Sequence, residues 1–273
     1  MPPKPTEPSD PLDYIRRRRN RPVIETVRNA IEMDNLVLAF QPIVYAEDTE
    51  RVAFHEGLIR LIDDNGEVIP ARDFIEEVEV LELGRRIDTA ALRAGIEALT
   101  DHQSLRLSIN MSARSIGYPD WMETLKDGLR SEPTLAERLI LEITESSAIS
   151  MPEIVSYFMA DLHSRGISFA LDDFGAGYTA FRFFRDFQFD IVKIDGQFSH
   201  NIADNSDAQV LMGALIAIAD QFDMFTVAEE VERQADLDYL RSSGIKCVQG
   251  YATGKPEIIP VWMEPGTKKR GYA

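Results

Sequence analysis

Cysteine is nearly absent from this chain of 273 residues, which contains a single one, Cys247. A single cysteine excludes an intramolecular disulfide and a zinc site built from several thiolates. Histidine is also scarce, because only four are present and they are scattered along the sequence. Neither residue type therefore offers a clustered metal-binding motif.

Positive charge is in short supply, since 29 lysines and arginines face 46 acidic residues and the net charge is -17. This balance argues against nonspecific nucleic-acid binding, which needs a basic surface. No apolar run approaches membrane-spanning length, and the proline-rich start, Met1–Pro11, lacks the apolar core of a signal peptide. The sequence predicts a soluble, cytoplasmic protein with no transmembrane segment and no bound nucleic acid.

Hydrophobic residues make up 44% of the chain, enough for one large barrel-type domain or two small ones. We predict a partly disordered tail at residues 1–22, one folded domain at 23–264 and a second tail at 265–273. The first tail carries an arginine-rich segment, Arg16–Arg21. It is either a solvated helix face paired with the domain's own acids or a dock for a partner or an anionic surface.

Short apolar or β-branched runs alternate with segments of helical period along the chain. One such helical segment, residues 207–222, is apolar on most of its faces. Alternation of this kind predicts an α/β fold with a parallel sheet closed as a (β/α)₈ barrel, although an open sheet of six or seven strands stays an alternative. The eight candidate strands are residues 36–44, 51–61, 105–112, 138–144, 167–173, 190–195, 224–230 and 246–251.

A polar residue closes nearly every one of these runs. One carboxylate at a strand end is more often a helix cap, but repetition over successive strands is hard to explain by capping. In a barrel these ends converge on one rim, and oxygen ligands without cysteine or histidine favour Mg²⁺ or Mn²⁺. The residues are Glu56, Asn110, Glu142, Asp172, Asp173, Lys193, Glu229 and Gln249.

Two adjacent carboxylates, Asp172 and Asp173, would repel each other unless cations lie between them and their partners. Neighbouring strand residues point to opposite faces, but the glycines in "FGAGY" permit a turn that brings both to one side. A pair of metal ions is a recurrent device for phosphoester hydrolysis. Arg60 shares a strand face with Glu56 and has the planar fork that suits a phosphate, although a surface salt bridge is an alternative.

The motifs "FHEGLIRL", "LEITES", "LDDFGAGYTAF", "VKID", "VAEEVE" and "QGY" occur in this order. From Asn35 to Pro260 the chain resembles the EAL domain family. The resemblance implies a TIM-like barrel with one antiparallel strand, hydrolysis of cyclic di-GMP to linear pGpG, two Mg²⁺ or Mn²⁺ ions and a homodimer. It implies that the first ion is held by Glu56, Asn110, Glu142 and Asp172.

The resemblance assigns the second ion to Asp172, which would be shared, together with Asp173 and Glu229. Lys193 would orient the attacking water or a phosphate oxygen, and Gln249 would support the water and the metals. Glu145 would anchor the loop after Asp173, through which the family couples dimerisation to metal binding. The implied substrate contacts are Arg60, Gln41, Pro42, Leu58, Asp195 and Tyr251.

Four residues depart from the family pattern but remove no metal ligand: His55, Leu61, Ala176 and Glu230. Glu230 replaces a usual glycine, and the alternation of "TVAEEVE" predicts an extended strand in which it points to the helical shell. The competing interpretation is that the position needs a positive φ. A catalytically silent cyclic di-GMP receptor and a protein-interaction barrel remain alternatives to the enzyme.

Overall fold

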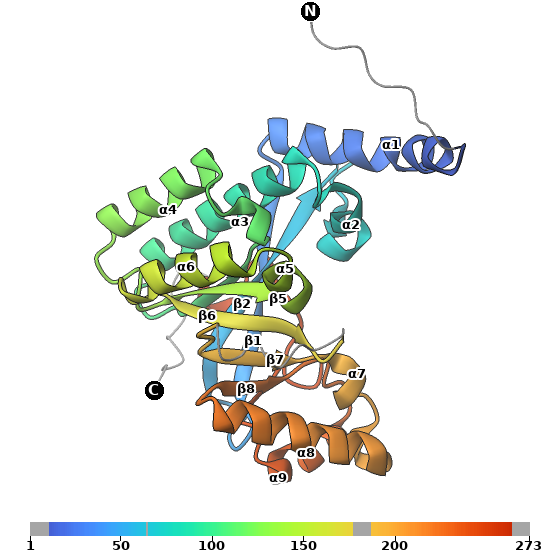
Figure 1. Ribbon diagram of the computed structural model, residues 1–273, viewed down its shortest axis with the longest axis vertical. Coiled ribbons are helices and arrows are strands. Elements are labelled where there is room, and N and C mark those ends of the chain that lie inside the picture. Colours follow the sequence, from blue (N-terminus) through green and yellow to red (C-terminus); the bar gives the residue numbers. More distant parts are fainter. Residues whose placement is uncertain (1–10, 64, 177–186, 264–273) are drawn as a thin grey trace, which may run out of the picture.

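The computed structural model describes residues 11–63, 65–176 and 187–263, with side chains described from residue 22 onward. Its centre is a sheet that closes on itself through pairing of β1 with β2 (Figure 1). The strands are β1 (Leu36–Tyr45), β2 (Val52–Ile62), β3 (Val68–Pro70), β4 (Leu107–Asn110), β5 (Leu139–Thr144), β6 (Ser168–Phe174), β7 (Ile191–Ile194), β8 (Phe225–Ala228) and β9 (Cys247–Val248).

Eight strands form the closed barrel in the order β1-β9-β8-β7-β6-β5-β4-β2, and β3 is appended to the outer edge of β2. β1 runs antiparallel to both of its neighbours, whereas the pairs from β2 through β4 to β9 are parallel. The predicted barrel with one antiparallel strand is therefore confirmed. Each of the eight predicted runs overlaps one barrel strand, and β1, β2 and β6 each extend one residue past the predicted end.

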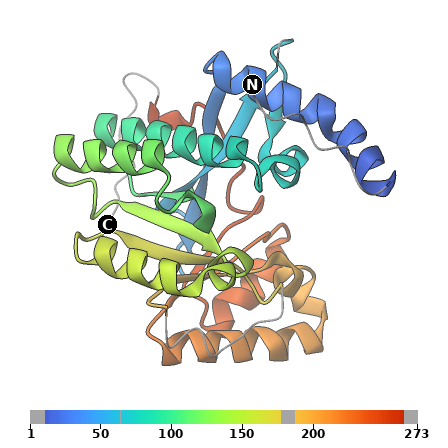
Figure 2. The ribbon, with the colours of Figure 1, turned by 45° about the horizontal axis from the view of Figure 1, so that its top comes forward.

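Helices cover the outside of the barrel. Figures 1 and 2 show α3, α4 and α6 along one flank, α8 and α9 along the opposite flank, and α1 at one end. The described helices are α1 (Pro11–Glu32), α2 (Ile75–Val78), α3 (Glu82–Asp101), α4 (Pro119–Ser131), α5 (Glu145–Ser150), α6 (Pro152–His163), α7 (Gly196–Ser199), α8 (Ser206–Gln221) and α9 (Gln234–Ser243).

Helical periodicity explains how these helices pack. α4 buries Trp121, Leu125 and Gly128, which lie one turn apart on a single face. A side chain at Gly128 would collide with Ile96 of α3, so the glycine lets the two helices approach closely. α8 begins where the side chain of Asn205 accepts hydrogen bonds from two free backbone N–H groups of its first turn.

The N-terminal segment and β3 were not predicted in this form. The backbone of α1 runs without a break from residue 11 to 32, so the predicted tail boundary at residue 22 falls inside a helix. The side chains of Arg16–Arg21 lie outside the described residues, and a partner or anionic surface for them stays a prediction. β3 completes a hairpin with β2 whose turn contains Asn65 and Gly66, a sequence signal for such a turn. None of the helices in the described part of the chain has both the length and the hydropathy needed to cross a bilayer.

Candidate metal centre

The ammonium group of Lys193 lies inside the barrel at the centre of a ring of acids. Lys193 is the third residue of β7, and its side chain is 1% exposed. Its Nζ lies 2.9 to 3.2 Å from one oxygen of each of four carboxylates. One lysine cannot neutralise four acids, so the group keeps an excess of negative charge. The four acids are Glu56, Glu142, Asp172 and Glu229.

Glu56 is held by three donors. Its Oε1 accepts from the Asn110 amide at 2.7 Å, and its Oε2 accepts from the Gln249 amide at 2.7 Å and from Lys193 at 3.2 Å. Gln249 also donates to Gln41 of β1 at 3.2 Å. β1, β2, β4, β7 and the residue after β9 thus supply one network. Glu56 lies within β2 and not at its end, because β2 continues past the barrel rim to pair with β3.

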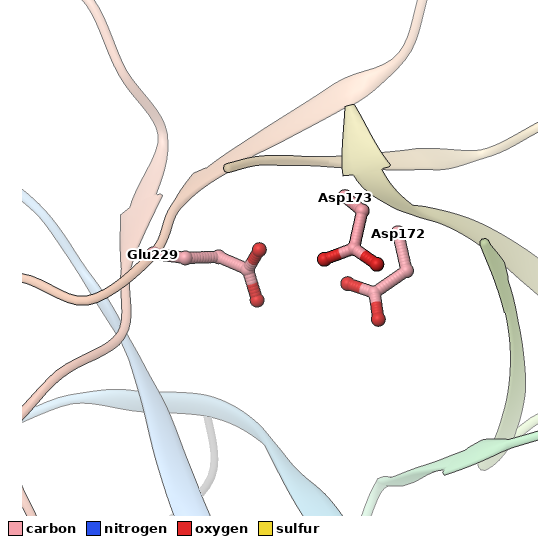
Figure 3. A group of neighbouring side chains, drawn as sticks. All are labelled: Asp172, Asp173 and Glu229. Atoms are coloured by element: carbon pink, nitrogen blue, oxygen red, sulfur yellow. The ribbon is translucent and has the colours of Figure 1, made fainter. Parts of the chain in front are cut away.

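A second group of acids comes from the ends of β6 and β8. Figure 3 shows the carboxylates of Asp172, Asp173 and Glu229 pointing toward one another, and an oxygen of each lies within 4.8 Å of the others. Asp172 and Asp173 reach one side because the strand bulges between Leu171 and Phe174, and Asp173 has a φ of 56°. The turn therefore begins at Asp173 itself, two residues before Gly175, the first of the predicted glycines, which also has a positive φ of 94°.

Crowding shifts the protonation of these acids. Burial raises the pKa of Glu142 to about 8, and the neighbouring Glu56 charge adds to this effect. Burial and the adjacent Asp172 raise the pKa of Asp173 to about 6. Burial also raises the pKa of Glu229 well above its ordinary value. Glu56 differs, because Lys193 and the hydrogen bonds from Gln249 and Asn110 outweigh burial and lower its pKa. An acid that keeps its proton near neutral pH can lose that proton when a cation binds its oxygens.

The donor set fits hard divalent cations. Oε1 of Glu142 and Oε1 of Gln249 are buried and accept no hydrogen bond from the described residues. Asn110 donates through its nitrogen, which leaves its amide oxygen as a possible ligand. The atoms that could ligate a cation here are therefore oxygens, and this chemistry suits Mg²⁺ or Mn²⁺.

A cavity of about 360 Å³ opens above this network. Arg60 and Leu58 line it from β2, in phase with Glu56 as the alternation predicted. Gln41 and Tyr251 also line it, whereas Pro42 lies on the opposite face of β1, where it faces Gly254. Asp195 lies at the start of α7 and accepts a hydrogen bond from the Gln197 backbone at 2.9 Å.

Comparison with protein-family models shows which family the chain belongs to. The model of the family described as "EAL domain" matches residues 24–256. The chain belongs to the EAL domain family. Its glutamate-glycine-leucine signature, Glu56–Leu58, lies within β2 with Glu56 and Leu58 facing the cavity.

Curated relatives of this EAL domain are longer proteins. It is 31% identical over 242 residues to the "Cyclic di-GMP phosphodiesterase PdeB" of Shewanella oneidensis, covering 87% of this chain and 28% of that protein. It is 29% identical over 241 residues to the "Probable cyclic di-GMP phosphodiesterase PdeA" of Escherichia coli, covering 87% of this chain and 32% of that protein. The chain thus spans about a third of these relatives.

Solved structures share the fold. The EAL domain of FimX from Pseudomonas aeruginosa bound to c-di-GMP matches with a TM-score of 0.78 at 24% identity, covering 86% of this chain and 96% of that one. The "PaMucR Phosphodiesterase, c-di-GMP complex" matches with a TM-score of 0.75 at 25% identity, covering 86% and 97%. Both structural matches cover most of this chain and nearly all of the solved structure.

Glu230, in the place of the EAL family's usual glycine, overturns the extended-strand prediction. β8 ends at Ala228, and Glu230 has a φ of 53°. This left-handed backbone turns the side chain toward the cavity, which Glu230 lines, and not toward the helical shell. The competing interpretation, a position that needs positive φ, is the correct one.

His55 and Leu61 are explained by packing on the outer side of β2. His55 is buried, and its Nε2 accepts a hydrogen bond from Nε1 of Trp262 at 3.2 Å. The Trp262 ring also packs against Phe40, so the C-terminal segment covers this side of the barrel. Leu61 is 1% exposed and packs in the core.

Ala176, the remaining described departure, donates its backbone N–H to the carbonyl of Asp173 at 3.1 Å.

Two charged residues of the cavity lining were missed by sequence reasoning. Arg72 lines the cavity from the segment that follows β3, and Glu232 lines it from the segment after β8. Arg72 could have been found from the Asn-Gly turn, because a hairpin at that point returns the chain to the end of β2. Glu232 carries no comparable signal, since it follows the irregular backbone at Glu230.

Proposed function

We propose that this EAL domain hydrolyses cyclic di-GMP to linear pGpG in a reaction that needs Mg²⁺ or Mn²⁺. The observation that carries the proposal is the group of four carboxylates around Lys193 beside an open cavity. The relatives named as cyclic di-GMP phosphodiesterases support the substrate. The cytoplasm stays the predicted location.

The roles proposed for the individual residues follow from the geometry. Bound cations would lower the pKa of a water and stabilise charge on the attacked phosphate. Glu56, Asn110, Glu142 and Asp172 surround one proposed ion position, and Asp172, Asp173 and Glu229 surround the other. Lys193 supplies an N–H donor that contacts acids of both groups, and we propose that it orients the attacking water or a phosphate oxygen.

Substrate contacts are proposed for the cavity walls. Arg60 is half-buried, and its guanidinium can hold a phosphate that is not being cleaved. Leu58, Gln41 and Tyr251 line the same cavity, and Gln249 links Gln41 to Glu56 through its amide. The implied contacts of Pro42 and Asp195 with the substrate remain predictions, because neither residue lines the cavity.

The function is tested by incubating purified protein with cyclic di-GMP and separating the products by chromatography. We expect pGpG with Mn²⁺ or Mg²⁺ and none with excess chelator, since water activation depends on the cation. We also expect none with Ca²⁺, which is larger and tolerates looser coordination. Full activity in chelator would contradict the metal mechanism.

A cyclic di-GMP receptor is the second candidate, and one observation favours it. Glu230 places a carboxylate beside the cavity where the family usually has glycine, and a negative charge there can slow the reaction of an anionic substrate. Binding of cyclic di-GMP with no turnover in Mn²⁺ would favour the receptor over the enzyme.

A homodimer is also proposed, and the outward face of α8 supports it. Val210 is 72% exposed and Leu211 is 50% exposed, and the neighbouring outward residues Ala214 and Ala217 are small and apolar. The chain has a net charge of -17, so two copies repel least where they meet through an uncharged face. Burial of exposed apolar side chains would favour such an association.

Glu145 is predicted to couple the metal site to this dimer. It begins α5 directly after β5 and is buried, and α5 packs against β6, the strand of Asp172 and Asp173. The loop that it is proposed to anchor includes residues 177–186, which lie outside the described residues. Glu145→Ala should raise the Mg²⁺ concentration needed for half-maximal activity and weaken dimerisation while the barrel stays folded.

The control for Glu145→Ala is Glu153→Ala, which removes an exposed carboxylate from α6. Activity measured over a range of Mg²⁺ concentrations gives the metal dependence of each variant, and analytical ultracentrifugation gives its oligomeric state. Equal Mg²⁺ dependence in the two variants would remove Glu145 from the mechanism.

A further inference from the structure

Glu230 occupies a backbone position that its own side chain disfavours. Its φ of 53° lies in the left-handed region, where residues with a Cβ are strained and glycine is not. The next residue holds this geometry, because Val231 donates to the carbonyl of Gln249 and accepts from the N–H of Ala252, both at 3.0 Å. Glycine would relieve the strain, so a strained glutamate at this point suggests a use for its side chain.

The neighbouring chain leaves room for the carboxylate of Glu230. A side chain at Gly196, directly after Asp195, would collide with the carboxyl group of Glu230. Glu230 is exposed and lines the cavity beside Glu229, but it is not part of the ring of acids around Lys193. Its carboxyl group thus lies beside Gly196, in an exposed residue that lines the cavity, where a ligand can reach it.

Opposite charges are separated along the cavity walls. Arg60 and Arg72 line it from β2 and from the segment after β3, and Glu230 and Glu232 line it from the segment after β8. A ligand that carries only phosphates would use the arginines and be repelled by the glutamates. A ligand that also presents N–H donors can bind the arginines through its phosphates and the glutamates through these donors.

We propose that Glu230 is a specificity-determining residue that accepts hydrogen bonds from the N1–H and 2-amino groups of a guanine base. Guanine presents these two donors side by side, and a carboxylate can accept both. Adenine presents an acceptor, N1, in place of the N1–H donor, so the carboxylate would meet a lone pair. A site built on hydrogen bonds discriminates strongly against an analogue that lacks the donor. This inference rests on the proposed function, since it names the base that the same cavity selects.

The test measures binding of three cyclic dinucleotides by calorimetry in Ca²⁺ buffer: cyclic di-GMP, cyclic di-IMP, which lacks the 2-amino group, and cyclic di-AMP. Glu230→Gln keeps the size and backbone of the side chain but loses the charge and one acceptor. It should weaken cyclic di-GMP binding by about 10-fold or more, since a hydrogen bond to a charged group is lost. It should weaken cyclic di-IMP binding less and leave cyclic di-AMP binding unchanged or stronger. Glu123→Gln, an exposed substitution on α4, is the matched control for charge.

A second variant separates recognition from folding. Glu230→Gly removes the strain together with the carboxylate, so its thermal midpoint should equal or exceed that of the wild type while guanine selectivity falls. A merely structural role would instead lower the midpoint and leave the ratio of the three affinities unchanged.

The outcomes that overturn the inference are distinct. Equal strengthening of all three ligands in Glu230→Gln would make Glu230 a repelling charge and not a base-reading group. Hydrolysis of cyclic di-GMP by a Glu230→Gln protein with unchanged selectivity would refute the inference and leave the proposed function intact. Wild-type protein that binds cyclic di-GMP without turnover would refute only the enzymatic function, and absence of binding to all three would refute both.

Discussion

Lys193→Met is expected to lower the free energy of unfolding of the metal-free protein by about 3–5 kcal/mol, the usual range when one partner of a buried ion pair is removed. Lys193 is the one cation in contact with Glu56, Glu142, Asp172 and Glu229 among the described residues. Methionine has a similar length and no charge, so it leaves these acids to repel one another in a buried site. Chemical denaturation in excess chelator measures the loss.

Mn²⁺ should return part of that stability, because a cation bound only by the folded state stabilises it and replaces the missing positive charge. Activity should not return, since the cation cannot supply the N–H donor that orients the water or phosphate. Lys126→Met, which changes an exposed lysine on α4, is the control and should alter stability by less than about 0.5 kcal/mol. Equal denaturation midpoints for the two variants would mean that Lys193 is not the charge that balances the ring.

The barrel was predictable from the sequence because its strands carry a strong local pattern. β5 and β7 are continuous apolar runs interrupted only by the inward-facing Glu142 and Lys193, and helical segments separate them. β3 was missed because three residues are too short for periodicity to register. A solvated helix face was one interpretation of the arginine run, but that run has no apolar stripe, so the sequence predicted neither the start of α1 at Pro11 nor its continuation past residue 22.

The site residues were predictable wherever one residue closes or interrupts an apolar run. Lys193 contacts Glu56, Glu142 and Glu229, although these residues come from β7, β2, β5 and the segment after β8. The backbone at Glu230 was not predictable, because alternation of apolar residues implies an extended strand and carries no information on φ. The residue after Glu230, Val231, lies so close to Gly250 that a side chain at Gly250 would overlap its backbone. That close approach is a tertiary effect between the ends of β8 and β9.

Asp173 illustrates the same limit. Two adjacent acids implied that something positive lies between them and their partners, and the structure brings Asp172 and Asp173 to one side as expected. The expected cause was glycine, and Gly175 does have a positive φ of 94°, but Asp173 is itself left-handed with a φ of 56°. Asp tolerates this conformation better than most residues, since its short polar side chain can bond locally. A motif can therefore predict which side chains meet without predicting which residue bends the backbone.

Asp172→Asn is expected to lower the rate of cyclic di-GMP hydrolysis by roughly 10²-fold or more, because it alters both proposed ion positions at once. Asp172 contacts Lys193 at 2.9 Å on one side and lies within 4.8 Å of Asp173 and Glu229 on the other. Asparagine keeps one oxygen but turns a carboxylate oxygen into an N–H donor, which cannot ligate a cation. The defect should therefore include weaker Mn²⁺ binding, measured directly by calorimetry and by the Mn²⁺ concentration needed for half-maximal rate.

Asp161→Asn is the matched control, since it removes an exposed carboxylate from α6. The fold of Asp172→Asn should be intact, because neutralising one of four acids around Lys193 lowers the repulsion in the ring. Loss of activity with an unchanged or higher denaturation midpoint is thus the expected signature of a metal ligand and not of a structural residue. A rate within a few fold of the control, at the same Mn²⁺ affinity, would show that Asp172 is not shared between two cations and would exclude the two-ion arrangement.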